Sequence, residues 1–146
     1  LGLAAAIPVI GDLGCGTGII GALAARLGAA QAELMDANIL AVASASATLA
    51  RNTIGNARAY AADGIPAAQL PSYDLVLSNP PFHVGKTIDY EVAQAFIRQT
   101  RQALRPNGQF VLVANQFLRY DRLLAAHFEH VACLAQTSSF RVWRAA

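Results

Sequence analysis

The residues most able to bind a ligand stand near the start of the chain, in the sequence Asp12-Leu13-Gly14-Cys15-Gly16-Thr17-Gly18. A carboxylate is followed there by three glycines at alternate positions. Glycine lets a ligand lie against the backbone, and a helix that begins after such a loop presents free N–H groups to it. The pattern predicts a ligand-binding turn between a strand and a helix, with the Asp12 carboxylate beside a cationic group of the ligand.

Three other polar residues, Asp36, Asp63 and Asn79, each follow an apolar run of strand length. In an open parallel sheet, ligands bind beyond the carboxyl ends of the strands. One polar residue at such a place is usually a turn residue or a helix cap. Because Asp12 and these three would fall at the ends of four successive strands, we interpret them as one site.

Residues 16–21 also match the G-x-G-x-x-G pattern of dinucleotide-binding proteins, so a nicotinamide oxidoreductase is an alternative. Asp12 argues against it, because a carboxylate beside the loop would repel a pyrophosphate and attract an ammonium group. The chain of 146 residues also offers no second domain to supply a hydride acceptor.

A second motif, Asn79-Pro80-Pro81-Phe82, follows the fourth apolar run. Alone it predicts only a diproline turn. After the glycine-rich loop it suits the capture of an amino group, because the Asn79 side-chain oxygen and the Pro80 carbonyl can accept both N–H bonds of that group. The prolines keep these acceptors ordered. Phe82 offers a face for base stacking worth ~1–3 kcal/mol, and a base in a duplex would have to flip out to reach it.

These motifs need a framework that brings strand ends together. Apolar runs of strand length alternate with helical periodicity, which predicts an α/β fold. We expect a Rossmann-like, seven-stranded, mostly parallel sheet with one antiparallel C-terminal strand and helices on both faces. The expected strands are 6–13, 32–36, 57–62, 74–78, 109–114, 130–135 and 140–144. The expected helices are 19–27, 38–52 capped by Asn38, one from Thr87 or Asp89 to just before Pro106, and 119–128.

Composition limits the class of protein. The length predicts one domain, 1–146, and the opening at Leu1 predicts a fragment that lacks an N-terminal domain. Two cysteines are too few for a disulfide framework or a zinc site, so we expect no metal. No run is long enough to span a membrane and no basic flank marks a signal peptide, so we expect a cytoplasmic protein that does not contact a membrane.

Charge is divided unequally along the chain. Through Asn79 there are three arginines and five acidic residues, whereas seven arginines and Lys86 face four acidic residues after it. The basic second half suits a nucleic-acid partner, and a solvated basic surface is the alternative. Trp143 is expected in the core rather than at the site.

The glycine-rich stretch resembles motif I of class I S-adenosylmethionine-dependent methyltransferases, and the resemblance extends over the whole chain. It implies S-adenosyl-L-methionine as cofactor and S-adenosyl-L-homocysteine as product. It further implies that Asp12 and the loop backbone face the methionine end, that Asp36 accepts both ribose hydroxyls, and that Asp63 meets the adenine amino group. The cofactor-binding residues implied in this way are Asp12, Gly14, Cys15, Gly16, Gly18, Asp36, Ala37, Asp63, Gly64 and Asn79.

The second motif resembles the Asn/Asp-Pro-Pro-aromatic motif of methyltransferases that modify exocyclic or amide nitrogens. With residues 83–86, 113–118 and 140–145 it resembles the catalytic domain of ribosomal RNA guanine-N2 methyltransferases of the methyltransferase-small family. This implies a monomeric enzyme that acts on ribosomal RNA or a ribosomal subunit, with 16S RNA favoured. The implied residues are Asn79, Pro80 and Phe82 for catalysis, and Pro81, His83, Lys86, Asn115 and Arg141 for substrate binding.

Three alternatives stay open. The same motif serves methylation of a protein glutamine at N5 and of adenine at N6, and a non-enzymatic, degenerate substrate-binding half would keep only the fold. Phe82 in place of tyrosine, followed by His83, favours guanine over the first two. Intact Asp12, Asp36 and Asn79 argue against the third.

Overall fold

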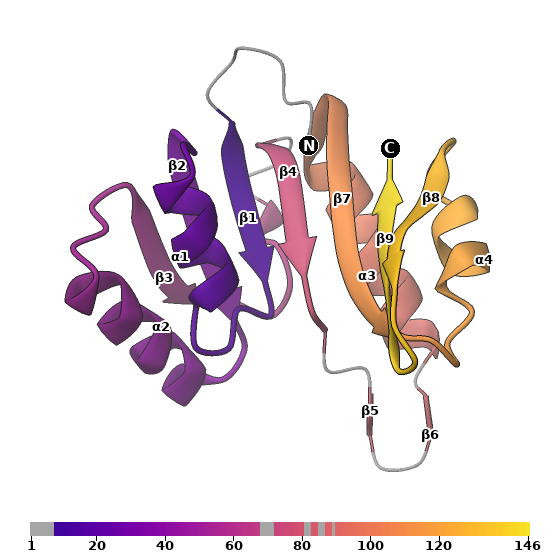
Figure 1. Ribbon diagram of the computed structural model, residues 1–146, viewed down its shortest axis with the longest axis horizontal. Helices are drawn as coiled ribbons and strands as arrows, with labels where there is room; N and C mark the ends of the chain where they lie inside the picture. The colour runs from indigo at the N-terminus through magenta and orange to yellow at the C-terminus, as the bar shows by residue number, and fades with distance from the viewer. Residues whose placement is uncertain (1–7, 68–71, 81–82, 85–86, 89) are drawn as a thin grey trace.

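The computed structural model describes residues 8–67, 72–80 and 90–146, together with the backbone of 83–84 and 87–88. Its centre is a seven-stranded sheet in the order β3-β2-β1-β4-β7-β9-β8 (Figure 1). β9 runs antiparallel to its neighbours β7 and β8, whereas the other pairs are parallel. The strands are β1 Val9–Leu13, β2 Gln31–Asp36, β3 Ala57–Ala61, β4 Tyr73–Ser78, β7 Leu104–Asn115, β8 Val131–Gln136 and β9 Phe140–Ala145.

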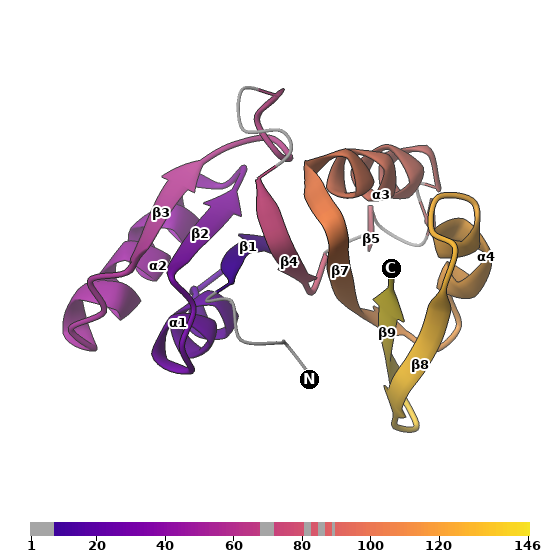
Figure 2. The ribbon, with the colours of Figure 1, turned by 90° about the horizontal axis from the view of Figure 1, so that it is seen from above.

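Among the described residues, four helices cover the two faces of this sheet. They are α1 Ile19–Arg26, α2 Ile39–Arg51, α3 Tyr90–Ala103 and α4 Tyr120–Ala125. Seen from above, α1 and α2 lie on one side of the sheet and α3 lies on the other (Figure 2). A short antiparallel pair, β5 His83–Val84 and β6 Thr87–Ile88, follows β4 and projects from the edge where that strand ends (Figure 1).

The two faces of the sheet are packed differently. On the side of α3 and α4 the core contains large side chains, among them Phe110, Ile97 and Trp143. On the side of α1 and α2 it consists mainly of alanines around Leu34. α1 and the loop before it approach α2 and β2 closely there, because Gly18 and Gly21 lack a Cβ. A Cβ on Gly18 would lie 2.8 Å from the Ala45 Cβ in α2, and a Cβ on Gly21 would lie 2.5 Å from the Leu34 Cγ in β2.

The predicted fold class is confirmed, including the single antiparallel strand near the C-terminus. Asn38 caps α2 as predicted, since its side chain accepts a 2.9 Å hydrogen bond from the Leu40 N–H. Trp143 is buried in the core, also as predicted. The start of the first predicted strand, residues 6 and 7, lies outside the described residues. No helix in the described ranges is long and apolar enough to cross a membrane.

Three details differ from the sequence-based expectation. β7 begins at Leu104 rather than at Gln109, because Leu104 already pairs with Tyr73, and the register then shifts before regular pairing starts at Gln109. α4 ends at Ala125, three residues before the predicted end at Phe128. The β5 and β6 pair was not expected, since two-residue strands leave no hydrophobic periodicity in the sequence.

Candidate active site

The glycine-rich loop connects β1 to α1 at the edge where the parallel strands end. Gly14, Gly16 and Gly18 have φ angles of 71°, 54° and 78°. Residues with a side chain disfavour such positive φ angles, so the backbone of this loop requires glycine at these three positions. The N–H groups of Gly14 and Cys15 both donate to the Met35 carbonyl, at 2.8 and 3.0 Å. The loop is therefore anchored to the end of β2 before any ligand arrives.

Asp12 lies beneath this loop and is buried. Its Oδ2 accepts a 2.8 Å hydrogen bond from the Gly21 N–H in α1, whereas its Oδ1 has no hydrogen-bond partner among the described residues. Burial raises the pKa of Asp12 to about 6, the Gly21 N–H opposes this rise, and the Asp36 charge adds to it. A buried carboxylate oxygen without a partner is a strong acceptor for a cation or a polar hydrogen.

Asp36 stands at the end of β2, opposite the loop. Its Oδ2 accepts from the Gly16 N–H at 3.0 Å and its Oδ1 accepts from the Asn38 N–H at 2.9 Å. The carboxylate thus ties the glycine-rich loop to the start of α2, a positioning contact that the sequence analysis did not foresee. Each oxygen keeps a second lone pair that can accept a hydroxyl.

The next strand end supplies Asp63 and Gly64, which directly follow β3 and Ala62. The Ala62 N–H donates to the Asp36 carbonyl at 3.0 Å, so this turn is joined to the end of β2. Asp63 is exposed, and Gly64 has a φ of 82°. Ala37, beside Asp36, is exposed as well. Four successive strand ends therefore carry the polar residues that the sequence assigned to them.

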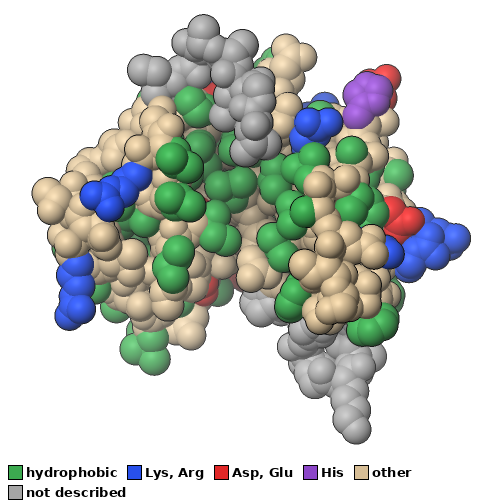
Figure 3. All heavy atoms as spheres, in the orientation of Figure 1, with side chains coloured by type: hydrophobic (Ala, Val, Ile, Leu, Met, Phe, Trp, Pro, Cys, Tyr) green, Lys and Arg blue, Asp and Glu red, His purple; other side chains and the backbone are tan. Residues whose placement is uncertain are grey.

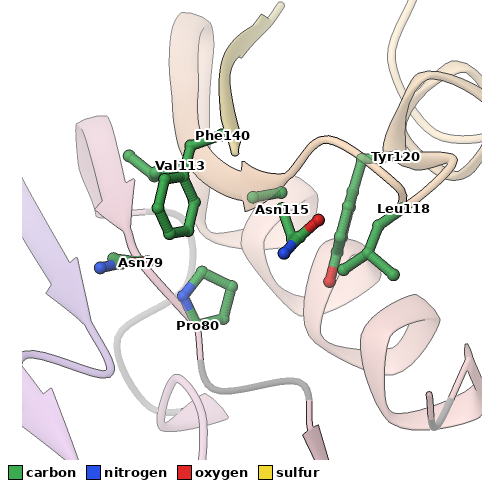
Figure 4. A pocket seen from close by; sticks show the side chains of 8 residues that line it. Asn79, Pro80, Val113, Asn115, Leu118, Tyr120 and Phe140 are labelled. Atoms are coloured by element: carbon green, nitrogen blue, oxygen red, sulfur yellow. The ribbon is translucent and has the colours of Figure 1, made fainter. Parts of the chain in front are cut away.

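A small pocket of about 120 Å³ lies beside this edge, between the ends of β4, β7 and β9. Asn79 and Pro80 line it at the end of β4, with the Asn79 side chain directed away from Asn115, and Asn115 lines it at the end of β7 (Figure 4). The Phe140 ring lies on the side of Asn79 and Pro80, and Tyr120 lies across from them. The complete lining is Asn79, Pro80, Val113, Ala114, Asn115, Leu118, Tyr120 and Phe140.

The predicted substrate residues divide into three groups. Asn115 lines the pocket, and its Oδ1 accepts from the Phe117 N–H at 3.0 Å. Arg141 does not line it: its Nε donates to Gln136 at 3.2 Å and its guanidinium lies over the Trp143 ring, on the other face of β9 from Phe140. Of the remaining predictions, Pro81, Phe82 and Lys86 lie outside the described residues, and His83 is described only by its backbone.

Five lining residues were not among the predicted site residues: Val113, Ala114, Leu118, Tyr120 and Phe140. Phe140 stands opposite Asn115 because of the antiparallel register between β7 and β9. The sequence predicted a hairpin of the last two strands but contained no signal for the pairing of β9 with β7. That register was the information needed to find Phe140. Within the described ranges, no group of three His, Cys, Asp or Glu side chains could hold a metal ion.

The strand order is that of a Rossmann-like methyltransferase fold. The family model of the methyltransferase small domain matches residues 4–144, and the chain belongs to that family.

Curated relatives include two proteins named ribosomal RNA small subunit methyltransferase C. The one from Hahella chejuensis is 42% identical over 135 residues, and the one from Vibrio vulnificus is 38% identical over the same length. In both cases the match covers 92% of this chain and 39% of the relative, so the chain spans about two fifths of the length of these relatives.

Solved structures with the same fold include a 16S rRNA N2 methyltransferase from T. thermophilus, in complex with AdoMet and guanosine. It superposes with a TM-score of 0.82 at 33% identity, over 94% of this chain and 37% of that one. An S-adenosylmethionine dependent methyltransferase from Mesorhizobium loti superposes with a TM-score of 0.58 at 27% identity, over 74% of this chain and 47% of that one.

Proposed function

We propose that this chain is the catalytic part of an enzyme that transfers a methyl group from S-adenosylmethionine to the N2 amino group of a guanine in the RNA of the small ribosomal subunit. The observation that carries the proposal is the pairing of two sites. A glycine-rich loop with carboxylates lies at the ends of β1 and β2, and the pocket of Asn79, Pro80 and Asn115 lies beside it. The names of the relatives support the same reaction and substrate.

The donor side fits S-adenosylmethionine by its chemistry. The buried Asp12 Oδ1, which lacks a partner among the described residues, suits the ammonium group of the methionine portion. Asp36 suits the ribose hydroxyls, and Asp63 with Gly64 suits the adenine. When bound, the cofactor supplies a methyl group on a positively charged sulfur, which is the electrophile of the reaction.

The acceptor side solves a different problem. The exocyclic amine of guanine is a weak nucleophile, because its lone pair is delocalised into the ring. The Asn79 side-chain oxygen and the Pro80 carbonyl accept its two N–H bonds and point the lone pair at the methyl group. Both acceptors are placed by the end of β4, so little ordering is needed during the reaction. The methylated amine then loses a proton to solvent.

The working protein, we infer, is longer than this chain. Its relatives are more than twice as long. In addition, α1 and the residue after it carry an outward apolar stripe of Ile19, Leu23 and Leu27, which are 66%, 56% and 78% exposed. Hydrophobic side chains gather on this face (Figure 3). A contiguous apolar surface is normally covered. A further domain of the same chain would cover it and help to select the RNA, in a monomeric cytoplasmic enzyme.

The test is methyl transfer by the full-length protein to ribosomal RNA and, in parallel, to protein from cells that lack its gene, followed by mass analysis of the nucleosides and of the peptides. We expect N2-methylguanosine in small-subunit RNA. Methylation of adenine N6 would instead identify an adenine methyltransferase, and methylation of a protein glutamine would identify a glutamine methyltransferase. Binding of the cofactor without transfer to any acceptor would favour a binding domain.

A further inference from the structure

Phe140 is an aromatic residue that lines the pocket although its side chain is 50% exposed. It is the first residue of β9 and stands opposite Asn115 at the end of β7. Its ring lies beside Asn79 and Pro80 (Figure 4). Three residues later, Trp143 lies on the other face of the strand and belongs to the core. The Phe140 ring thus faces the pocket and not the hydrophobic core of the domain.

The backbone of Phe140 is held from both sides. Its N–H donates to the Thr137 Oγ1 at 3.0 Å, and its carbonyl accepts from the Thr137 N–H at 2.8 Å. The same turn is joined to the loop after β7, because the Gln116 N–H donates to the Ser139 carbonyl at 2.9 Å. With the backbone fixed in this way, only the two side-chain torsions of Phe140 need to be ordered when a ligand covers the ring.

We propose that the Phe140 ring stacks on the acceptor base and holds it in the pocket while Asn79 and Pro80 align its amino group. This inference rests on the proposed function, and it adds a residue that recognises the planar face of the base. An aromatic ring that is half exposed in the free protein, carried on a hydrogen-bonded backbone and adjacent to two polar acceptors is suited to stacking. Asn115, on the same wall, offers its amide to the edge of the base.

The roles of Phe140 and Asn79 differ in a measurable way. Stacking contributes to the capture of the base, so its loss raises the KM for RNA. The Asn79 oxygen aligns the amine, so its loss lowers kcat. No residue of the glycine-rich loop lines the acceptor pocket that contains Phe140. We therefore expect the affinity for the methyl donor not to depend on Phe140.

The experiment uses the full-length protein and an RNA whose target guanine is replaced by 2-aminopurine, which keeps the 2-amino group and loses fluorescence on stacking. Phe140→Ala is expected to retain less than half of the wild-type quenching. With unmodified RNA it is expected to raise KM by about 10-fold, with kcat within about twofold of wild type and donor affinity unchanged. Phe140→Tyr and Phe140→Trp are expected to restore both the fluorescence quenching and the KM of the wild-type protein. Phe140→Leu is expected to restore neither.

Phe117 provides the matched control, because it is 79% exposed on the adjoining loop and does not line the pocket. Phe117→Ala should quench as wild type does. If Phe140→Ala quenches fully with an unchanged KM, or if Phe140→Leu restores both quantities, Phe140 is only an apolar rim residue and the inference is wrong. In that case the wild-type protein would still methylate guanine. If the wild-type protein methylates no guanine, the proposed function itself fails and the inference fails with it.

Discussion

Ser78 donates a 2.6 Å hydrogen bond from its buried hydroxyl to the main-chain carbonyl of Leu13. The two residues are register partners on the adjacent strands β4 and β1. Leu13 is followed directly by the glycine-rich loop, and Ser78 is followed directly by Asn79 and Pro80. One side-chain hydrogen bond therefore joins the proposed donor site to the proposed acceptor site at the point where the two strands end.

Replacing Ser78 by alanine is expected to weaken this connection. The free energy of unfolding should fall by about 0.5–1.5 kcal/mol, because the Leu13 carbonyl loses a buried partner. The rate of methyl transfer should fall by more than the loss of folded protein explains, because the donor and acceptor sites are no longer held in line. Urea unfolding and single-turnover transfer measure the two effects. Ser72→Ala, at the other end of β4, is the control, and an equal loss of transfer in both variants would contradict the prediction.

Asp12 should make stability depend on pH. Its pKa is raised from 3.8 to about 6 in the folded protein, mainly by burial. Between these two values the folded state holds a proton that the unfolded state has lost, so the free energy of unfolding falls as pH rises through this range, by about 3 kcal/mol in all. Asp12→Asn should remove that slope.

Urea unfolding at several pH values between 4 and 7 compares the two proteins, and all other titrating groups contribute equally to both. The same carboxylate should couple pH to donor affinity. A bound ammonium favours the ionised form, so affinity for S-adenosylmethionine should fall as pH drops from 7 to 5. A wild-type slope that survives in Asp12→Asn would assign the pH dependence to another group.

Asp36 is expected to act on both the loop and the donor. Asp36→Ala removes two charge-assisted hydrogen bonds to the Gly16 and Asn38 N–H groups and the proposed contact with the ribose. Donor affinity should weaken by roughly 1–3 kcal/mol, as measured by calorimetry. Asp36→Asn keeps one acceptor oxygen, so its donor affinity should lie between those of the wild type and Asp36→Ala. Unchanged affinity in Asp36→Ala would remove this residue from the cofactor site.

The sequence was sufficient to place Asp12, Asp36 and Asn79, because each follows an apolar run and the strands beside it are parallel. Their partners were not predictable in the same way. That Asp36 holds Gly16, and that Phe140 lies beside Asn79, depends on how loops and antiparallel strands meet in space. The register of β7 with β9 pairs residues that are far apart in the chain, so no short-range pattern in the sequence reports it.

The basic second half of the chain predicts a salt-dependent affinity for RNA. Phosphate contacts release counterions, so affinity should fall as salt rises from dilute to physiological concentration. Arg141→Glu with Lys86→Glu should flatten this slope. Arg26→Glu, at the end of α1 in the acidic half, should leave it nearly unchanged. Filter binding with unstructured RNA measures the slopes, and an affinity that is indifferent to salt would favour a protein substrate.

Asn79 separates catalysis from binding. Its side-chain oxygen is proposed to hold the acceptor amine in line with the methyl group, and it lies in the pocket rather than in the glycine-rich loop. Asn79→Ala in the full-length protein should therefore weaken donor affinity far less than it slows methyl transfer. It should lower methyl transfer by ~100-fold or more, the usual scale for removing one preorganised polar group from a transition state. Asn79→Asp keeps an oxygen at the same place and should recover part of the rate.

Single-turnover transfer at saturating RNA isolates this step from base capture. If Asn79→Ala transfers methyl groups at the wild-type rate, the residue is only part of a turn after β4, and the acceptor amine is aligned by other groups.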